Sequence, residues 1–276
     1  MAVIAPIDAW AQPVLAGALE RVPEIRRLFE QSGTGALLQV TLDPEAMVQL
    51  MDAAGVDRVL LSAWCRPGGW VFSNDDVHEY VRAFPDRFLG AAAVDLEHPM
   101  EALKELDRAV NDLGFKALRM IPWLWDRPPN HRLYYPLFAR CVELDIPFCT
   151  QVGHTGPLRS SETGRPIPYI DQVALDFPEL RIVGGHIGYP WADEMISLAW
   201  KHANVFIDTS AYLPRYYPKP LLHFLSTYGR DKVLFGSNFP QLDWARCVQG
   251  IGELNLPAEI EESFLRDNAK RVFHLD

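Results

Sequence analysis

Short apolar runs alternate with longer amphipathic segments along the whole chain. Each apolar run has between four and seven residues and is followed by a turn or loop signal. Runs of this length without polar alternation are typical of strands that are buried on both faces of a parallel sheet. The expected strands are Val3–Asp8, Arg58–Ser62, Phe88–Val94, Phe115–Ile121, Pro147–Val152, Leu180–Gly185, Val205–Asp208 and Lys232–Gly236.

The segments between these runs carry apolar residues spaced three and four apart, which predicts helices at Pro44–Ala54, Glu101–Leu113 and Leu133–Leu144. Asp43 is suited to cap the first of them, with Pro44 at the first helical position. A strand followed by a helix, repeated about every 30 residues, predicts parallel strands joined by right-handed crossovers. Eight such units favour a closed (β/α)8 barrel of the TIM type, formed by residues 1–276 as a single domain. The run Leu37–Leu42 is either an extra strand or part of a long first loop.

Composition narrows the class of protein. Of the 276 residues 49% are hydrophobic, which is enough for a large core, and the net charge of −10 argues against nucleic-acid binding. We expect no membrane span and no signal peptide, because no apolar run is long enough to cross a bilayer and no basic segment precedes one. The four cysteines lack metal-ligand spacing, so a cytoplasmic protein with free thiols is expected.

In a barrel of this type the chemistry lies on the loops that follow the carboxyl ends of the strands. Histidine, amide and aromatic side chains gather at these positions, and three of the segments form recognisable motifs. The motifs are Gly153-His154-Thr155-Gly156, Gly184-Gly185-His186-Ile187-Gly188 and Leu234-Phe235-Gly236-Ser237-Asn238-Phe239-Pro240. Together they resemble the amidohydrolase superfamily, in particular its amidohydrolase-2 branch of aromatic-acid decarboxylases and lactone-type hydrolases. The resemblance covers nearly the whole chain.

The resemblance implies a metal held by a His-x-His pair after the first strand, the strand-five histidine and an aspartate at strand eight. In this sequence the pair is replaced by Trp10 and Gln12, and the aspartate by Asn238, so that only His154 is unchanged. An indole has no lone pair for a metal and a neutral amide is a weak ligand. We therefore expect no tightly bound metal. The alternative is zinc, manganese or iron held by Asp8, His154 and His186, a two-histidine, one-carboxylate set.

Aromatic residues are frequent at the same strand ends, which predicts a pocket for a flat or apolar small molecule. The alternative for each of them is a structural role in capping the mouth of the barrel. Arg119 is interpreted either as a clamp on a substrate carboxylate or as a partner of Asp8 or Asp208. The residues expected to bind substrate are Trp10, Gln12, Trp64, Arg119, Trp123 and Tyr212.

The leading hypothesis is a hydrolase that acts on a small carboxylate or lactone-like substrate without a tightly bound metal. His154 or His186 would act as general acid or base, and Asn238 and Gln12 would orient a carbonyl or a water molecule by hydrogen bonds. One alternative is a non-catalytic paralogue that supports a metal-containing amidohydrolase. The other is a metal-dependent hydrolase or decarboxylase with rearranged ligands. A homodimer and a hetero-oligomer with a paralogous amidohydrolase are both compatible with the sequence.

Overall fold

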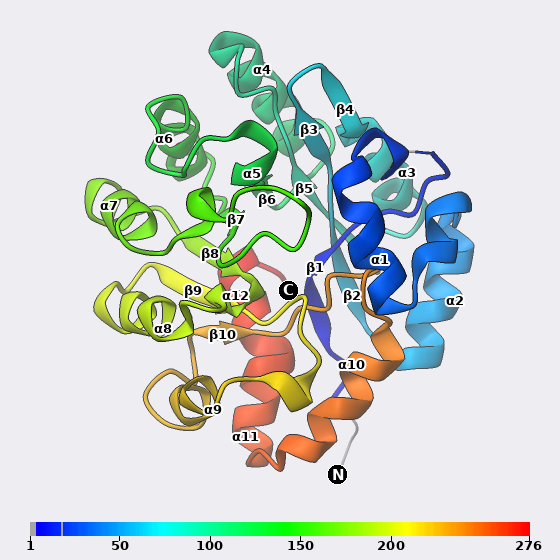
Figure 1. Cartoon of the computed structure of the whole chain (residues 1–276), viewed down its shortest axis with the longest axis vertical. Coiled ribbons are helices and arrows are strands. Elements are labelled where there is room, and N and C mark those ends of the chain that lie inside the picture. Colours follow the sequence, from blue (N-terminus) through cyan, green and yellow to red (C-terminus); the bar gives the residue numbers. More distant parts are fainter. Residues whose placement is uncertain (1–3, 18) are drawn as a thin grey trace.

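The computed structural model describes residues 4–17 and 19–276 and contains eight parallel strands surrounded by helices (Figure 1). The strands follow one another around the sheet in chain order, as a (β/α)8 barrel requires. They are β1 (Ile7–Ala11), β2 (Arg58–Ser62), β5 (Phe88–Ala92), β6 (Ala117–Met120), β7 (Phe148–Gln151), β8 (Ile182–Gly185), β9 (Val205–Asp208) and β10 (Val233–Leu234). The predicted barrel is confirmed. The first strand begins later than expected, and Val3 lies outside the described residues.

The barrel is nearly closed, because β1 is hydrogen-bonded to the segment that follows β10. The Ala9 amide donates to the carbonyl of Phe235 at 2.9 Å, and the Asn238 amide donates to the carbonyl of Trp10 at 2.8 Å. A parallel bridge between Ala11 and Phe239 continues this contact toward the carboxyl ends of the strands. We call the contact between β1 and residues 235–239 the closure seam.

Two layers of core hold the barrel together. A large cluster fills the space between the strands and the outer helices, and a smaller one fills the inside of the ring. The C-terminal helix α12 (Asn268–Phe273) contributes Ala269, Val272 and Phe273 to the inner cluster, so this helix closes one end of the barrel. Figure 1 shows it, in red, behind the ring of strands.

The predicted helices form within two residues of their expected bounds. In α2 the Asp43 side chain accepts a hydrogen bond from the Ala46 amide at 2.8 Å, which confirms the predicted cap. None of the helices in the described residues is long and apolar enough to cross a membrane. The helices are α1 (Arg26–Ser32), α2 (Pro44–Ala54), α3 (Asn74–Ala83), α4 (Pro99–Asn111), α5 (Pro122–Trp125), α6 (Tyr135–Glu143), α7 (Tyr169–Asp176), α8 (Ala192–Lys201), α9 (Lys219–Ser226), α10 (Trp244–Ile251), α11 (Ala258–Glu262) and α12.

One segment follows the second of two alternatives that the sequence left open, as part of a long first loop, and another was not expected. The run Leu37–Leu42 is not a strand: a 3-10 helix at Gly35–Gln39 occupies its first half, within a long first loop that also contains α1. After β2 the chain forms a short antiparallel hairpin that was not predicted, made of β3 (Trp64–Arg66) and β4 (Gly69–Phe72). Both segments lie outside the eight-stranded sheet and border its open end.

Candidate active site

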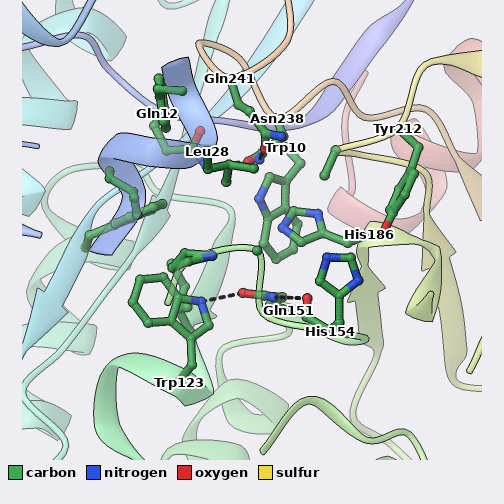
Figure 2. Close-up of a pocket in the computed structure, with 17 residues that line it drawn as sticks. Trp10, Gln12, Leu28, Trp123, Gln151, His154, His186, Tyr212, Asn238 and Gln241 are labelled. Carbon is green, nitrogen blue, oxygen red and sulfur yellow. Dashed lines mark hydrogen bonds between the residues drawn. The ribbon is translucent and has the colours of Figure 1, made fainter. Parts of the chain in front are cut away.

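A cavity of about 230 Å³ lies at the carboxyl ends of the strands. Its walls come from β1, from the end of β7 and from the segments that follow β2, β6, β7, β8, β9 and β10, and residues of the first loop cover one side. Figure 2 shows the two histidines, the Trp10 indole and the amides of Asn238 and Gln241 around this space. The lining residues are Trp10, Gln12, Ile25, Leu28, Phe29, Trp64, Ile121, Trp123, Gln151, His154, Gly156, Pro157, His186, Ala211, Tyr212, Asn238 and Gln241.

The aromatic walls are held in fixed orientations. Trp64 and Trp123 meet edge to face, with ring centroids 6.5 Å apart and an interplanar angle of 88°. The Trp123 indole N–H donates to Gln151 Oε1 at 2.5 Å, and the Gln151 amide donates to the carbonyl of His154 at 3.1 Å (Figure 2). Because hydrogen bonds hold Trp123 and Gln151 and the edge-to-face contact holds Trp64, the walls offer flat apolar faces in a defined geometry. The buried Trp64 indole N–H has no hydrogen-bond partner in the described structure.

His186 follows β8 and is tied to the next strand. Its Nδ1 lies 2.7 Å from the hydroxyl of Ser210, and its ring packs against Trp10 with centroids 5.1 Å apart. Burial lowers the pKa of His186 to about 3, and the charges of Arg119 and His154 act in the same direction. At neutral pH this imidazole is therefore uncharged and can accept a proton.

His154 follows β7 and is less constrained than His186. Its backbone is fixed, since its amide donates to the carbonyl of Tyr189 at 2.6 Å. In the described part of the chain its imidazole has no hydrogen-bond partner, and its main ring contact is an edge-on approach to Tyr189 at 5.7 Å. Burial lowers the pKa of His154 as well, so it too favours the neutral form.

Three amides form a hydrogen-bonded chain on the opposite wall. Gln12 donates from Nε2 to Asn238 Oδ1 at 2.9 Å, and Asn238 donates from Nδ2 to Gln241 Oε1 at 2.5 Å. Gln12 belongs to the loop after β1, whereas the other two residues follow β10. The chain crosses the closure seam and places polar, uncharged groups beside the aromatic walls.

Backbone strain is concentrated around the cavity. His186, Ala211 and Asn238 line it with φ angles of 67°, 66° and 67°, a left-handed conformation that few non-glycine residues adopt. The β-branched Ile187 has a φ of 63°, which is less favourable still. Conformations of this kind persist only where the surrounding structure imposes them, and they cluster at active sites and ligand sites.

Arg119 does not line the cavity, which corrects its predicted role as a clamp on a substrate carboxylate. Its side chain is 1% exposed, and its guanidinium donates to the carbonyls of Ala9 at 2.8 Å and Ala11 at 3.3 Å. The guanidinium carbon lies 3.9 Å from the Trp10 ring centroid, beneath the indole. The predicted ion pair with Asp8 or Asp208 is not formed either. Arg119 is therefore a structural cation that supports Trp10.

The alternative metal set of Asp8, His154 and His186 is not assembled. Asp8 is fully buried and its carboxylate accepts hydrogen bonds from the Trp10 amide, from Ser237 and from the Trp244 indole at 2.7 Å. Among residues 4–17 and 19–276, no three His, Cys, Asp or Glu side chains form a group that could hold a metal ion. Beside the two histidines, the cavity wall offers an indole, which has no lone pair for a metal, and four neutral amides, which are weak ligands for a divalent cation.

The structure thus brings together most of the residues that the sequence singled out. The cavity is lined by Trp10, Gln12, Trp64, Trp123, His154, His186, Tyr212 and Asn238, whereas Arg119 and Asp8 are buried outside it. Sequence reasoning did not assign a site role to Gln151 and Gln241, although both lie in or beside quoted strand-end segments. It also missed Leu28 and Phe29, which reach the cavity from α1 in the first loop. No local pattern marks that helix as part of the site.

Comparison with known proteins defines the class to which the chain belongs. The profile of the amidohydrolase-2 family, described as amidohydrolase, matches residues 7–275, and the chain belongs to this family. The chain is also similar to the gamma-resorcylate decarboxylase of Rhizobium sp. (strain MTP-10005). The two are 24% identical over an alignment that covers 84% of this chain and 87% of that protein.

Solved structures support the fold. An uncharacterised TIM-barrel protein from Bordetella bronchiseptica superposes with a TM-score of 0.83 and 24% identity, covering 98% of each chain. A dihydroxybenzoic acid decarboxylase from Polaromonas sp. JS666, solved with manganese and 2-nitroresorcinol, has a TM-score of 0.74 and 16% identity. That alignment covers 99% of this chain and 97% of the other. Because manganese is present in such a neighbour, a divalent metal stays among the alternatives, and the absence of a tightly bound metal stays a prediction.

Proposed function

We propose that the protein is an enzyme that hydrolyses an activated C–O bond, in a lactone or an aryl ester, within a small flat molecule. The observation that carries this proposal is His186, a neutral imidazole fixed on the wall of an aromatic cavity. A pKa this far below neutrality makes His186 a weak base, but its free nitrogen can still accept the proton of an attacking water molecule. A general acid would need a protonated imidazole at neutral pH, which this pKa disfavours more strongly. An activated ester is within reach of such a base without a metal.

The reaction follows from these groups. His186 takes a proton from a water molecule as the water oxygen attacks the ester carbonyl, and the C–O bond to the leaving group then breaks. The proton returns from the imidazolium to the leaving oxygen, so that a carboxylic acid and an alcohol or phenol are released. Trp10, Trp64 and Trp123 would bind the flat part of the substrate, and the chain of Gln12, Asn238 and Gln241 would hydrogen-bond its oxygen atoms.

A neutral substrate is favoured over a carboxylate. No lysine or arginine lines the cavity among the described residues, and both histidines favour the uncharged form. Moving a carboxylate from water into such a site without a paired cation is costly. Of the two kinds of substrate expected from the sequence, a lactone-like molecule is therefore favoured over a small carboxylate.

Decarboxylation of an aromatic acid is the second candidate. It is favoured by the similarity to a decarboxylase of gamma-resorcylate and by the flat, apolar shape of the cavity. Loss of CO2 from an aromatic ring requires an acid that protonates the ring carbon. The two histidines of this site both favour the neutral form and are therefore poor proton donors. A supporting role beside a metal-containing paralogue, the oligomeric state and a cytoplasmic location stay predictions.

The experiment is a substrate panel of small lactones, aryl esters and hydroxybenzoates, measured as acid release and as CO2 release on the same protein. We expect acid release from lactones or esters, and a loss of kcat/KM of about 100-fold or more in His186→Gln. His223→Gln is the matched control, because His223 is exposed on the outside of the barrel. The metal content of the same samples is measured in parallel, and we expect less than about a tenth of an equivalent per chain.

Three results would contradict the proposal. They are CO2 release without acid release from esters, an unchanged rate in His186→Gln, and activity that disappears with a chelator and returns with one metal equivalent. A His186→Gln variant that has lost its fold would be recognised by its circular dichroism, and Ser210 variants then report on the same imidazole.

A further inference from the structure

His186 is the end of a chain of hydrogen bonds that leads into the barrel. Its Nδ1 lies 2.7 Å from Ser210 Oγ, and the Ser210 hydroxyl is in turn hydrogen-bonded to Asp208 Oδ1. Ser210 and Asp208 are both fully buried, and Asp208 is the last residue of β9. Three residues from two neighbouring strands therefore form one connected unit beneath the cavity.

The direction of these hydrogen bonds is fixed by the backbone. Asp208 Oδ1 also accepts the Ser210 amide N–H at 2.9 Å, so this oxygen acts as an acceptor. A proton bound by this carboxyl group is therefore placed on Oδ2, and the Ser210 hydroxyl proton points toward Oδ1. This leaves the hydroxyl oxygen to accept from His186, whose backbone amide also donates to it at 3.3 Å. The proton of the neutral imidazole is consequently placed on Nδ1, where it faces Ser210.

The other ring nitrogen is left for a ligand. His186 lines the cavity, and its Nε2 has no hydrogen-bond partner within the described ranges. With the proton on Nδ1, Nε2 carries a lone pair and accepts a hydrogen bond. His154, which has no comparable chain of partners behind its imidazole, is free to take either tautomer.

The backbone makes room for this unit. A Cβ atom on Gly236 would lie 2.1 Å from Asp208 Oδ2, so a glycine is required where the next strand ends. Only a residue without a side chain at position 236 allows the Asp208 carboxyl group to occupy this space beside the closure seam. The glycine at position 236 therefore leaves the space that the buried Asp208 carboxyl group occupies.

We propose that Asp208 and Ser210 are positioning residues that hold His186 in the Nδ1–H tautomer, with Nε2 aimed at the cavity as an obligatory hydrogen-bond acceptor. The group that meets Nε2 must therefore be a donor, such as a water molecule or a hydroxyl group, and not a carboxylate or a carbonyl oxygen. This inference rests on the proposed function for its catalytic meaning. The tautomer itself is independent of any substrate.

The test is nitrogen-15 NMR of the histidine side chains at neutral pH in the protein without ligand, with His186 assigned from the His186→Gln spectrum. We expect the His186 signal of wild type to show the Nδ1–H tautomer, as His98 and His274 should also do because their Nδ1 atoms face carboxylates. Ser210→Ala should show a mixture of both tautomers at His186 and leave the other two signals unchanged. Asp208→Asn keeps a carbonyl oxygen that can accept from Ser210 and should keep the tautomer. Ser197→Ala, at an exposed serine of α8, is the matched control and should leave the spectrum unchanged.

Kinetics give the second readout. Ser210→Ala should lower kcat about tenfold with little change in KM, because the imidazole stays in place while its active tautomer is diluted. An Nε2–H tautomer in wild type, or a Ser210→Ala spectrum identical to wild type, would overturn the inference. If the tautomer is confirmed and no lactone or ester is hydrolysed, the proposed function fails and the positioning role stands.

Discussion

Asp208 illustrates how a buried group at the end of a strand acquires unusual chemistry. Burial raises the pKa of Asp208 to about 7, and its two hydrogen bonds from Ser210 only partly oppose this effect. The second carboxyl oxygen has no hydrogen-bond partner in the described structure. An ionised carboxylate in this position is costly, so the folded protein binds a proton more tightly there than the unfolded chain does.

The sign of the pH effect follows from that difference. Below about pH 4 Asp208 is protonated in both the folded and the unfolded chain. Between about pH 4 and 7 it is protonated only in the folded protein, so the free energy of unfolding falls as the pH rises through this range. Above about pH 7 Asp208 is ionised in both states, and its contribution no longer changes. Asp208→Asn removes this titration. The free energy of unfolding of wild type, relative to Asp208→Asn, should fall by up to about 4 kcal/mol over that range. Urea unfolding at several pH values measures it, and a difference independent of pH would contradict the raised pKa.

At single positions, the sequence predicted the site where a motif directly follows a strand. His154, His186 and Asn238 are examples, because the carboxyl end of a parallel strand always opens on the same face of the barrel. Arg119 lies on a strand with its side chain inside the ring. Whether such a side chain reaches the cavity depends on which residue lies above it. In this protein the Trp10 indole lies above Arg119. That relation joins residues distant in sequence, and no local pattern contains it.

At the level of elements, the first loop is attached to both sides of the cavity. Glu24, next to the residues that cover the site, lies 3.6 Å from Arg66 of the β3–β4 hairpin and 3.8 Å from Arg159 of the loop after β7. The Leu158 amide also donates to the carbonyl of Glu24 at 3.3 Å. One carboxylate thus connects three segments that were not expected to meet. The run Leu37–Leu42 belongs to this loop, where Leu38 is buried and Leu37 and Leu42 are partly buried against the core, whereas Val40 is exposed.

Removing this charge should loosen the cover of the cavity. Glu24→Gln weakens both ion pairs, and because Glu24 is only partly exposed we expect KM to rise about threefold to tenfold with a smaller change in kcat. Glu30→Gln is the control on α1, since Glu30 is exposed and forms no ion pair in the described structure. Raising the salt concentration should bring wild type toward the variant. An equal effect of both substitutions would show that the ion pairs do not hold the loop.

For the whole molecule, one end of the barrel is closed by α12 and the other holds the cavity. Repetition of strand and helix is enough to predict the barrel, because apolar runs of this length have few other arrangements. It does not predict which helix closes the ring, since α12 has the same amphipathic pattern as helices on the outside. Phe273 of α12 is 2% exposed and belongs to the inner cluster.

Truncating this side chain should destabilise the entire barrel. Phe273→Ala leaves a void inside the ring, and we expect it to lower the free energy of unfolding by about 3 kcal/mol. Trp200→Ala, at an aromatic residue of the outer surface that is 70% exposed, should change stability by less than about 0.5 kcal/mol. Chemical denaturation measures both. If the two variants lost stability equally, α12 would not be part of the barrel core.

The closure seam has a consequence for the biosynthesis of the protein. Trp10 and Gln12 belong to the first strand and the loop after it, while Asn238 and Gln241 follow the last strand, and the cavity needs all four. A nascent chain that has not yet released residues 235–241 from the ribosome has no cavity, however well its earlier units have folded. A ligand of this cavity would therefore recognise only the finished ring and act as a reporter of its completion.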